Sequence, residues 1–182
     1  MERAVGDLRE RQNQRANGRT LILGAGPGLD VPRLSNYVTD LVLEEPEPSF
    51  QRYLQAIYPD IPLLVSPAER LEMPDESFDT VLTSLVLCSV ARLDTVLEEI
   101  HRVLVPGGQY LFLEHVLSGR PLARAVQIGL NPVWRPLAGG CNLTRDVRSA
   151  LLASPLDLKE YQLVRPGPLI PIVVGRASRR AR

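Results

Sequence analysis

The stretch Thr20-Leu21-Ile22-Leu23-Gly24-Ala25-Gly26-Pro27-Gly28 indicates the fold more clearly than any other part of the chain. Its first four residues form an apolar run that is typical of a buried strand, and glycines follow directly at positions 24, 26 and 28. A strand, a glycine-rich turn and the start of a helix, in this order, present backbone N–H groups to a ligand in α/β proteins. The alternative is a tight connecting turn that binds nothing.

The spacing of these glycines favours a nucleoside ligand over a dinucleotide. The dinucleotide fingerprint G-x-G-x-x-G needs its third glycine at position 29, where this chain has Leu29. Here the third glycine comes one residue earlier, a spacing that suits a ligand without a pyrophosphate. We therefore expect S-adenosylmethionine to bind at the loop, rather than NAD or FAD.

Apolar runs and helical patterns alternate along the chain. Residues 93–104 place apolar side chains three and four residues apart, which predicts an amphipathic helix that Pro106-Gly107-Gly108 ends. This alternation predicts an α/β fold, with a Rossmann-like, mostly parallel sheet and helices on both faces. The other helices are expected at residues 2–16, 28–37 and 49–57, and the strands at residues 20–23, 41–43, 61–65, 78–84, 110–116, 158–164 and 169–174.

Length limits the domain organisation. The 182 residues are enough for one α/β domain, 1–182, and too few for two. Within that domain we expect an N-terminal helix in residues 1–18 that could close over the ligand as a lid. We also expect a small, solvated basic tail at residues 177–182.

Charge and cysteine content exclude several classes of function. The net charge is zero, so a broad basic surface for nucleic acid is not expected. The two cysteines, Cys88 and Cys141, form neither a metal-spaced cluster nor a disulfide framework, which fits a reducing cytoplasm. The N-terminus is dense in charge, and the longest apolar stretch, Val81 to Val90, is about half of a membrane helix. We therefore expect a cytoplasmic protein without a bound metal, a nucleic-acid partner or a membrane partner.

Ligands of open parallel sheets bind at the carboxyl ends of the strands. Glu45 follows the second expected strand, and a carboxylate there can accept hydrogen bonds from both ribose hydroxyls; Glu44 is its rival. The third strand leads to residues that can meet the adenine, and the fourth leads to residues that reach the sulfonium. The residues expected to bind the cofactor are Gly24, Ala25, Gly26, Gly28, Glu45, Pro46, Ala68, Glu69, Ser84 and Leu85.

Several segments carry a resemblance to known proteins. Asp75-Glu76-Ser77-Phe78-Asp79, Leu85-Val86-Leu87-Cys88-Ser89-Val90 and Arg102-Val103-Leu104-Val105-Pro106-Gly107-Gly108 resemble class I S-adenosylmethionine-dependent methyltransferases. Residues 85–90 are also similar to the methyltransferase-like 7 group, which includes alkyl-thiol S-methyltransferases. So are Glu114-His115-Val116, Asn131-Pro132-Val133-Trp134 and Gly140-Cys141-Asn142-Leu143-Thr144-Arg145. The resemblance spans roughly residues 20 to 175. It implies a class I methyltransferase fold of seven strands, the last antiparallel to the others.

The chain departs from the family pattern in two places. Such families usually carry an acidic residue two positions before the first glycine of the loop, and this chain has Ile22. Because that acid normally helps to order the loop, its absence predicts a lower affinity for the cofactor without loss of binding. Eukaryotic members of the group begin with a hydrophobic membrane segment, whereas this chain begins with a charged one.

Candidate acceptor-site residues lie towards the C-terminal half. His115 ends the fifth expected strand and can act as a base or orient the acceptor; the alternative is a structural histidine bonded to a backbone carbonyl. We expect Cys88, Trp134 and Asn142 to line the substrate pocket; a lone cysteine in an apolar run is more often a small core residue, and a core role is the alternative for Trp134 as well. The segment from Gly119 to Ala153 is expected to shape this pocket.

A site poor in bases favours a soft, acidic nucleophile, because a thiol needs little help to ionise. The sequence thus predicts a methyltransferase that uses S-adenosylmethionine to methylate a small molecule, most simply a thiol. Two alternatives stay open. One is a C-, O- or N-methyltransferase of a secondary metabolite or quinone, and the other is a non-catalytic relative with the same fold. The sequence does not indicate the acceptor or the oligomeric state.

Overall fold

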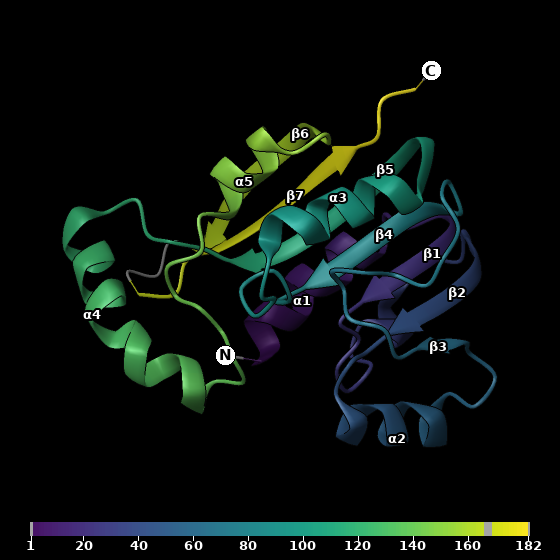
Figure 1. Ribbon diagram of the computed structural model, residues 1–182, viewed down its shortest axis with the longest axis horizontal. Coiled ribbons are helices and arrows are strands. Elements are labelled where there is room, and N and C mark those ends of the chain that lie inside the picture. The colour runs from purple at the N-terminus through teal and green to yellow at the C-terminus, as the bar shows by residue number, and fades with distance from the viewer. Residues whose placement is uncertain (1, 166–168, 182) are drawn as a thin grey trace.

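A computed structural model of the chain describes residues 2–165 and 169–181. In this part of the chain, seven strands form one sheet in the order β3-β2-β1-β4-β5-β7-β6 (Figure 1). Neighbouring strands pair in parallel from β3 to β5, and β7 is antiparallel to both β5 and β6. The predicted mostly parallel sheet with an antiparallel last strand is therefore confirmed. The strands are β1 (Gly18–Leu23), β2 (Val38–Glu44), β3 (Leu63–Leu64), β4 (Phe78–Ser84), β5 (Leu104–His115), β6 (Asp157–Arg165) and β7 (Ile172–Ser178).

Helices cover both faces of the sheet (Figure 1). Alternate residues of β1 separate the two faces: Leu21 and Leu23 pack in one buried cluster with α3 and α5, and Ile22 packs in another with α2. Helix α1 contributes Val5 to a third cluster, against β5 and β7. The helices are α1 (Glu2–Asn13), α2 (Pro48–Ile57), α3 (Leu93–Val103), α4 (Pro121–Leu137) and α5 (Val147–Ala153), with one 3₁₀ turn, η1 (Val31–Arg33).

The helix predicted at residues 28–37 is wrong. Only η1 forms there, since Gly28 has a φ of 74° and Leu34 is extended, which leaves too few residues for an α-helix. Other boundaries also differ from the prediction: the strand expected at residues 41–43 spans 38–44, the one expected at 169–174 spans 172–178, and the helix expected at 2–16 ends at residue 13. The third strand is limited to β3, and Pro106-Gly107-Gly108 lies inside β5 rather than between α3 and a later strand. Helices α4 and α5 were not predicted as helices.

Buried polar contacts tie α1 to the sheet. The Gln12 side chain donates to the carbonyl oxygens of Gly175 (2.5 Å) and Phe112 (3.2 Å). The Asn13 amide donates to Asp30 Oδ1 at 2.7 Å, and Arg9 pairs with the same aspartate. These contacts hold the C-terminal half of α1 against the rest of the domain, and the lid stays a prediction.

The predicted basic tail at residues 177–182 is wrong in its first part. Ala177 is buried, and Ser178 still belongs to β7. The Arg179 guanidinium donates to the carbonyl oxygens of Leu104 (2.9 Å) and Arg102 (3.1 Å), and it pairs with Glu76. Pairing with β5 and β6 orders this end, which composition alone does not indicate. Over the residues described, no helix has both the length and the apolar character needed to cross a bilayer.

Candidate active site

The glycine loop lies at the carboxyl end of β1, between β2 and β4 in the sheet. Gly24, Gly26 and Gly28 have φ angles of 65°, 54° and 74°, in the left-handed region that glycine adopts without strain. A Cβ on Gly24 would lie 2.7 Å from Cγ2 of Val86, and one on Gly28 would lie 2.8 Å from Cε2 of Tyr58. Both conformation and space therefore require glycine at these two positions.

Two adjacent carboxylates at the end of β2 hold the loop. Glu44 Oε2 accepts a hydrogen bond from the N–H of Gly24 at 2.8 Å, and Glu45 Oε2 accepts one from the N–H of Gly26 at 2.6 Å. Ile22, at the position where the family resemblance implies an acid, is buried in the core. The carboxylates that order the loop therefore come from the end of β2, Glu44 and Glu45, and not from position 22 in β1.

Burial changes the ionisation of Glu44. Its side chain is inaccessible to solvent, and burial raises its pKa to about 8, with the neighbouring Glu45 carboxylate adding to the rise. The bond from Gly24 N–H opposes this rise. Glu44 Oε1 has no hydrogen-bond partner among the residues described. A protonated Glu44 can therefore offer its hydroxyl to a ligand while the other oxygen holds the loop.

We expect the Glu44→Gln variant to lose much of the pH dependence of folding stability. A carboxyl with a pKa of about 8 in the folded state and 4.5 in the unfolded state binds more protons when folded. Its contribution is full below pH 4.5 and is lost as pH rises through 8, at about 1.4 kcal/mol per unit of pKa shift. Urea unfolding at intervals from about pH 5 to about pH 8.5 measures the slope. An unchanged slope in the variant would contradict this assignment; some slope should remain, because burial raises the pKa of Glu114 to about 7.

A cavity of about 540 Å³ opens beside the glycine loop, and we call it the Glu45 cavity. It brings together predicted residues from four separate segments of the chain. Glu44 also lines it. The predicted cofactor residues in its wall are Gly24, Glu45, Pro46, Ala68, Glu69 and Leu85.

The other predicted cofactor residues support the loop instead of lining this cavity. Ala25 and Gly28 are buried, and Gly26 contacts the Glu45 carboxylate through its N–H. The Ser84 hydroxyl donates to Asp30 Oδ1 at 2.8 Å, away from the described wall of the cavity. These residues therefore fix the shape of the loop rather than the wall of the cavity.

A second cavity, of about 280 Å³, adjoins the first, and we call it the His115 cavity. Leu85 and Ser89, in the segment after β4, line both cavities, so the two meet there. Leu85 has a φ of 63°, a strained backbone conformation for a leucine that the surrounding structure must hold. Helix α4 and the segment after it contribute Trp134, Ala138 and Cys141 to the wall.

Three of the four predicted acceptor-site residues line the His115 cavity: His115, Cys88 and Trp134. His115 is buried, and neither ring nitrogen has a hydrogen-bond partner within the described residues. The backbone-carbonyl bond of the structural alternative is therefore not formed in the described residues, and the role of His115 stays a prediction. Asn142 does not reach the cavity wall; its side-chain oxygen accepts from the N–H and hydroxyl of Thr144, and its N–H donates to the carbonyl of Cys88.

The two free cysteines come together at this cavity. Both line it, beside His115. The Cys88 thiol lowers the pKa of Cys141 by hydrogen bonding to its sulfur, and His115 and Trp134 lower it further. The same contact, together with burial, raises the pKa of Cys88. Cys141 is therefore the more acidic thiol of the pair.

The fold and the two adjoining cavities can be compared with known proteins. The family model described as a methyltransferase domain matches residues 21–112, about half of the chain. The chain belongs to this methyltransferase family. The methyltransferase domain implies S-adenosylmethionine as the methyl donor, and the chemistry of the Glu45 cavity fits that molecule. Carboxyl groups there can bind ribose hydroxyls, and apolar side chains such as Phe50 and Ala68 can flank a base.

Two curated relatives are similar over most of the chain. Thiol S-methyltransferase TMT1A from Homo sapiens is 37% identical over 139 residues, which cover 67% of this chain and 57% of that protein. Thiol S-methyltransferase TMT1B from Rattus norvegicus is 36% identical over 151 residues, which cover 80% of this chain and 58% of that protein. The chain thus spans less than two thirds of the length of either relative.

A solved structure shares the fold of this methyltransferase domain. The crystal structure of the YcgJ protein from Bacillus subtilis superposes over 100% of both chains with a TM-score of 0.78, at 15% sequence identity. At that identity the likeness shows the fold alone. The order of strands and the antiparallel β7 are thus those of class I methyltransferases.

Sequence reasoning missed three residues that organise the methyltransferase site. Glu114 is buried, and its carboxylate accepts hydrogen bonds from the N–H groups of Val86 (3.2 Å) and Leu87 (3.1 Å), so it fixes the segment between the cavities. Asp30 links α1 to the end of β4 by accepting hydrogen bonds from Asn13 and Ser84, and Cys141 joins Cys88. An acid directly before His115 was a usable signal for Glu114; the other two depend on contacts distant in sequence.

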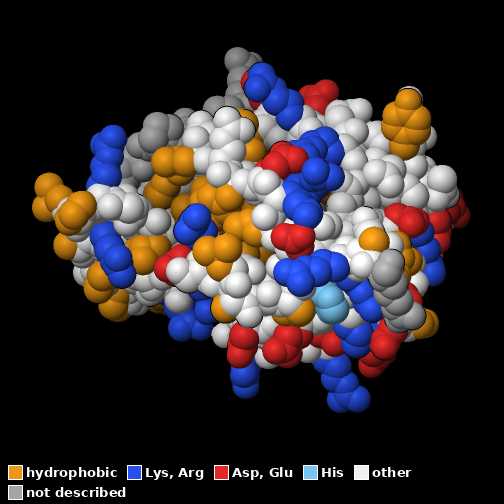
Figure 2. Space-filling view, turned by 90° about the horizontal axis from the view of Figure 1, so that it is seen from above, with side chains coloured by type: hydrophobic (Ala, Val, Ile, Leu, Met, Phe, Trp, Pro, Cys, Tyr) orange, Lys and Arg blue, Asp and Glu red, His pale blue; other side chains and the backbone are white. Residues whose placement is uncertain are grey.

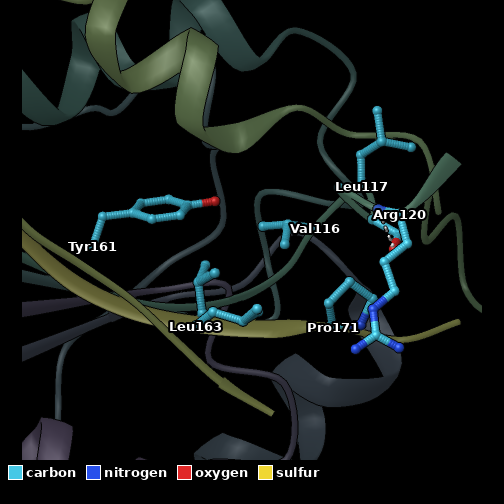
Figure 3. Close-up of a pocket in the computed structure, with 9 residues that line it drawn as sticks. Val116, Leu117, Arg120, Tyr161, Leu163 and Pro171 are labelled. Atoms are coloured by element: carbon cyan, nitrogen blue, oxygen red, sulfur yellow. Dashed lines mark hydrogen bonds between the residues drawn. The ribbon is translucent and has the colours of Figure 1, made fainter. Parts of the chain in front are cut away.

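A third cavity lies apart from the methyltransferase site. It has a volume of about 240 Å³ and shares no lining residue with the other two among the residues described. Figure 3 shows Tyr161 and Arg120 at opposite sides of this cavity, with Val116, Leu163 and Pro171 between them. In the described residues, no group of three or more His, Cys, Asp or Glu side chains is arranged to hold a metal ion.

Proposed function

We propose that this chain transfers the methyl group of S-adenosylmethionine to the sulfur of a small thiol. The observation that carries the proposal is the His115 cavity: a mostly apolar space that contains one unpartnered imidazole and no carboxylate among the described residues of its wall. The names of the two curated relatives support the same chemistry. The small-molecule size of the acceptor follows from the volume of the cavity, about 280 Å³.

For the methyl donor, we propose that Glu45 binds the ribose hydroxyls and that Glu44 adds a second polar contact through Oε1. Ala68, Glu69 and Pro46 form the wall around the base. Glu69 also holds this wall in place, because its Oε1 accepts hydrogen bonds from the N–H groups of Ala91 (2.8 Å) and Arg92 (3.2 Å).

The reaction is an in-line displacement, for which alignment and the exclusion of water supply most of the acceleration. Bound S-adenosylmethionine supplies a methyl carbon already activated by its sulfonium. A lone pair of the acceptor sulfur forms the new carbon–sulfur bond, and the electrons of the breaking bond return to the donor sulfur, which becomes neutral. A ring nitrogen of His115 takes the thiol proton and passes it to solvent. Leu85 and Ser89, at the junction of the cavities, mark where the two sulfurs approach.

The choice of a thiol depends on what the cavity lacks. An aliphatic alcohol needs a strong, well-placed base, and in the described wall His115 is the base available. A thiol is already a few per cent ionised near neutral pH and is strongly nucleophilic.

The test is the release of S-adenosylhomocysteine by the purified chain with acceptors matched in shape: benzyl mercaptan, benzyl alcohol, benzylamine and a phenol. Rapid turnover of the thiol alone is the expected result. Turnover of the phenol or amine with a silent thiol would replace the proposal with an O- or N-methyltransferase. Silence with all acceptors, together with weak binding of S-adenosylmethionine, would indicate a non-catalytic relative.

We expect the His115→Gln variant to distinguish between a base and a structural residue. With an alkyl thiol of high pKa, kcat should fall about 100-fold, because a positioned base contributes about that much. With an aryl thiol that is already ionised, kcat should change by less than about threefold, since proton removal is not required. Equal losses with both thiols would assign His115 a structural role.

The proposal includes a cytoplasmic location and no nucleic-acid partner. The thiols Cys88 and Cys141 both face the His115 cavity, and a cavity lined by thiols stays reduced in that compartment. The net charge of zero offers no broad attraction for phosphate backbones.

A further inference from the structure

Helix α4 exposes an apolar surface that neither cavity uses. Figure 1 shows α4 standing at one end of the molecule, away from the sheet. Leu122 and Leu137 are each 81% exposed and Val133 is 64% exposed, while Val126 and Leu130 are partly exposed. Because these five residues follow one another at intervals of three or four, they form one continuous stripe along the helix.

The charge around this stripe has one sign. From Val116 to Arg145 the sequence contains four arginines and no acidic residue, although the whole chain has no net charge. Arg120, Arg124 and Arg135 are exposed, and none of them forms an ion pair with a carboxylate in the described residues. Figure 2 shows hydrophobic side chains gathered at the end of the molecule that carries α4, with blue side chains among them.

The inner side of the same helix faces the methyltransferase site. Trp134 and Ala138 line the His115 cavity, and the buried Gln127 donates to the carbonyl oxygens of Val116 (3.3 Å) and Leu169 (3.1 Å). The helix therefore forms part of the wall of the acceptor cavity. Whatever covers its outer stripe also lies next to the acceptor.

We propose that α4 docks on the surface of an anionic lipid bilayer, with Leu122, Val126, Leu130, Val133 and Leu137 in the acyl boundary and the arginines at the headgroups. An apolar stripe bordered by arginines is the composition of an interfacial helix. Anionic lipids supply the negative charge that the helix lacks, at about 1 kcal/mol for each arginine near the surface. A second copy of this chain fits less well, since it would place arginines against arginines.

Docking would bring α4, whose inner side lines the His115 cavity, to the bilayer, where an apolar acceptor is concentrated. This consequence for the substrate rests on the proposed function, whereas the docking itself does not. The proposal departs from the sequence-based expectation of no membrane partner, which concerned spanning and anchoring segments. It requires only a peripheral contact.

The test measures binding of the full chain to vesicles, independent of catalysis. Trp134 is the single tryptophan and lies on α4, so its fluorescence reports directly on the docking helix. Mixed phosphatidylcholine–phosphatidylglycerol vesicles that carry brominated acyl chains should quench this fluorescence and sediment with the protein. Pure phosphatidylcholine should bind at least about tenfold more weakly, and added salt should weaken binding to the mixed vesicles.

Matched variants assign the effect to the stripe. Leu122→Asp and Leu137→Asp should each weaken vesicle binding at least about tenfold with unchanged thermal melting, because both side chains are 81% exposed. Leu152→Asp, on α5 and 57% exposed, should leave vesicle binding unchanged. Absence of quenching, equal losses in all three variants, or self-association that Leu122→Asp abolishes would each overturn the proposal. Methyl transfer to a water-soluble thiol should be unaffected by Leu122→Asp, so failure of docking and failure of the proposed function are distinguishable.

Discussion

The Glu45→Gln variant is expected to bind S-adenosylmethionine about 100-fold more weakly than the unaltered chain. Both oxygens of Glu45 accept hydrogen bonds, from the N–H groups of Gly26 (2.6 Å) and Glu47 (2.9 Å), and the proposed ribose contact is made by the same carboxylate. An amide replaces one acceptor with a donor and removes the charge, and a lost hydrogen bond to a charged group costs about 1.5–3 kcal/mol. Titration calorimetry with S-adenosylhomocysteine measures the loss.

The control for this variant is Glu98→Gln, an exposed carboxylate on α3 that lies outside both cavities. It makes the same change of charge and should leave the affinity unchanged. If Glu45→Gln also kept its affinity while Glu44→Gln lost it, the ribose contact would belong to Glu44 instead. If neither variant changed the affinity, the Glu45 cavity would not be the binding site.

The Gly175→Ala variant is expected to lose about 3 kcal/mol of folding stability, which lowers the melting temperature by roughly 10 °C. A Cβ at this position in β7 would overlap the Phe112 ring and the backbone carbonyl of Glu160. The ring is fully buried and the carbonyl belongs to the paired strand β6, so neither can move aside easily. The carbonyl of Gly175 also receives the Gln12 hydrogen bond that holds α1.

Gly129→Ala is the matched control for stability. Gly129 lies within α4, and a Cβ there would meet no atom within 4 Å. The change should alter stability by less than about 1 kcal/mol, towards greater stability, because alanine favours a helix. Thermal unfolding followed by circular dichroism compares the two variants. Equal losses of folding stability in the two variants would mean that steric overlap of a Cβ with Phe112 and Glu160 is not the reason for glycine at position 175.

The sequence predicted the sheet well because its strands are continuous apolar runs. Residues 78–84 were predicted as a strand and form β4 with the same limits, and the apolar spacing of residues 93–104 predicted α3 to within one residue. The spacing of apolar residues along the sequence reflects which side chains are buried. It therefore predicts buried strands and a helix with one buried face. The carboxyl ends of those strands then indicated where Glu45 and His115 would lie.

The features that were not predicted depend on backbone conformation and on contacts between residues distant in the sequence, which the spacing of apolar residues does not indicate. Helix α4 buries few of its side chains and contains Pro132 and Pro136, so its sequence has neither the spacing nor the composition of an ordinary helix. The helix expected at residues 28–37 is prevented by the positive φ of Gly28, which a sequence does not state. The meeting of Cys88 with Cys141 joins segments more than fifty residues apart in the sequence.

The account rests on two cavities that meet at Leu85 and Ser89, with the methyl donor in one and the acceptor in the other. The most direct measurement is a crystal structure of the chain with S-adenosylhomocysteine. We predict the ribose against Glu45 and the sulfur at Leu85, directed into the His115 cavity. A nucleoside bound elsewhere, or a sulfur directed away from His115, would contradict the account.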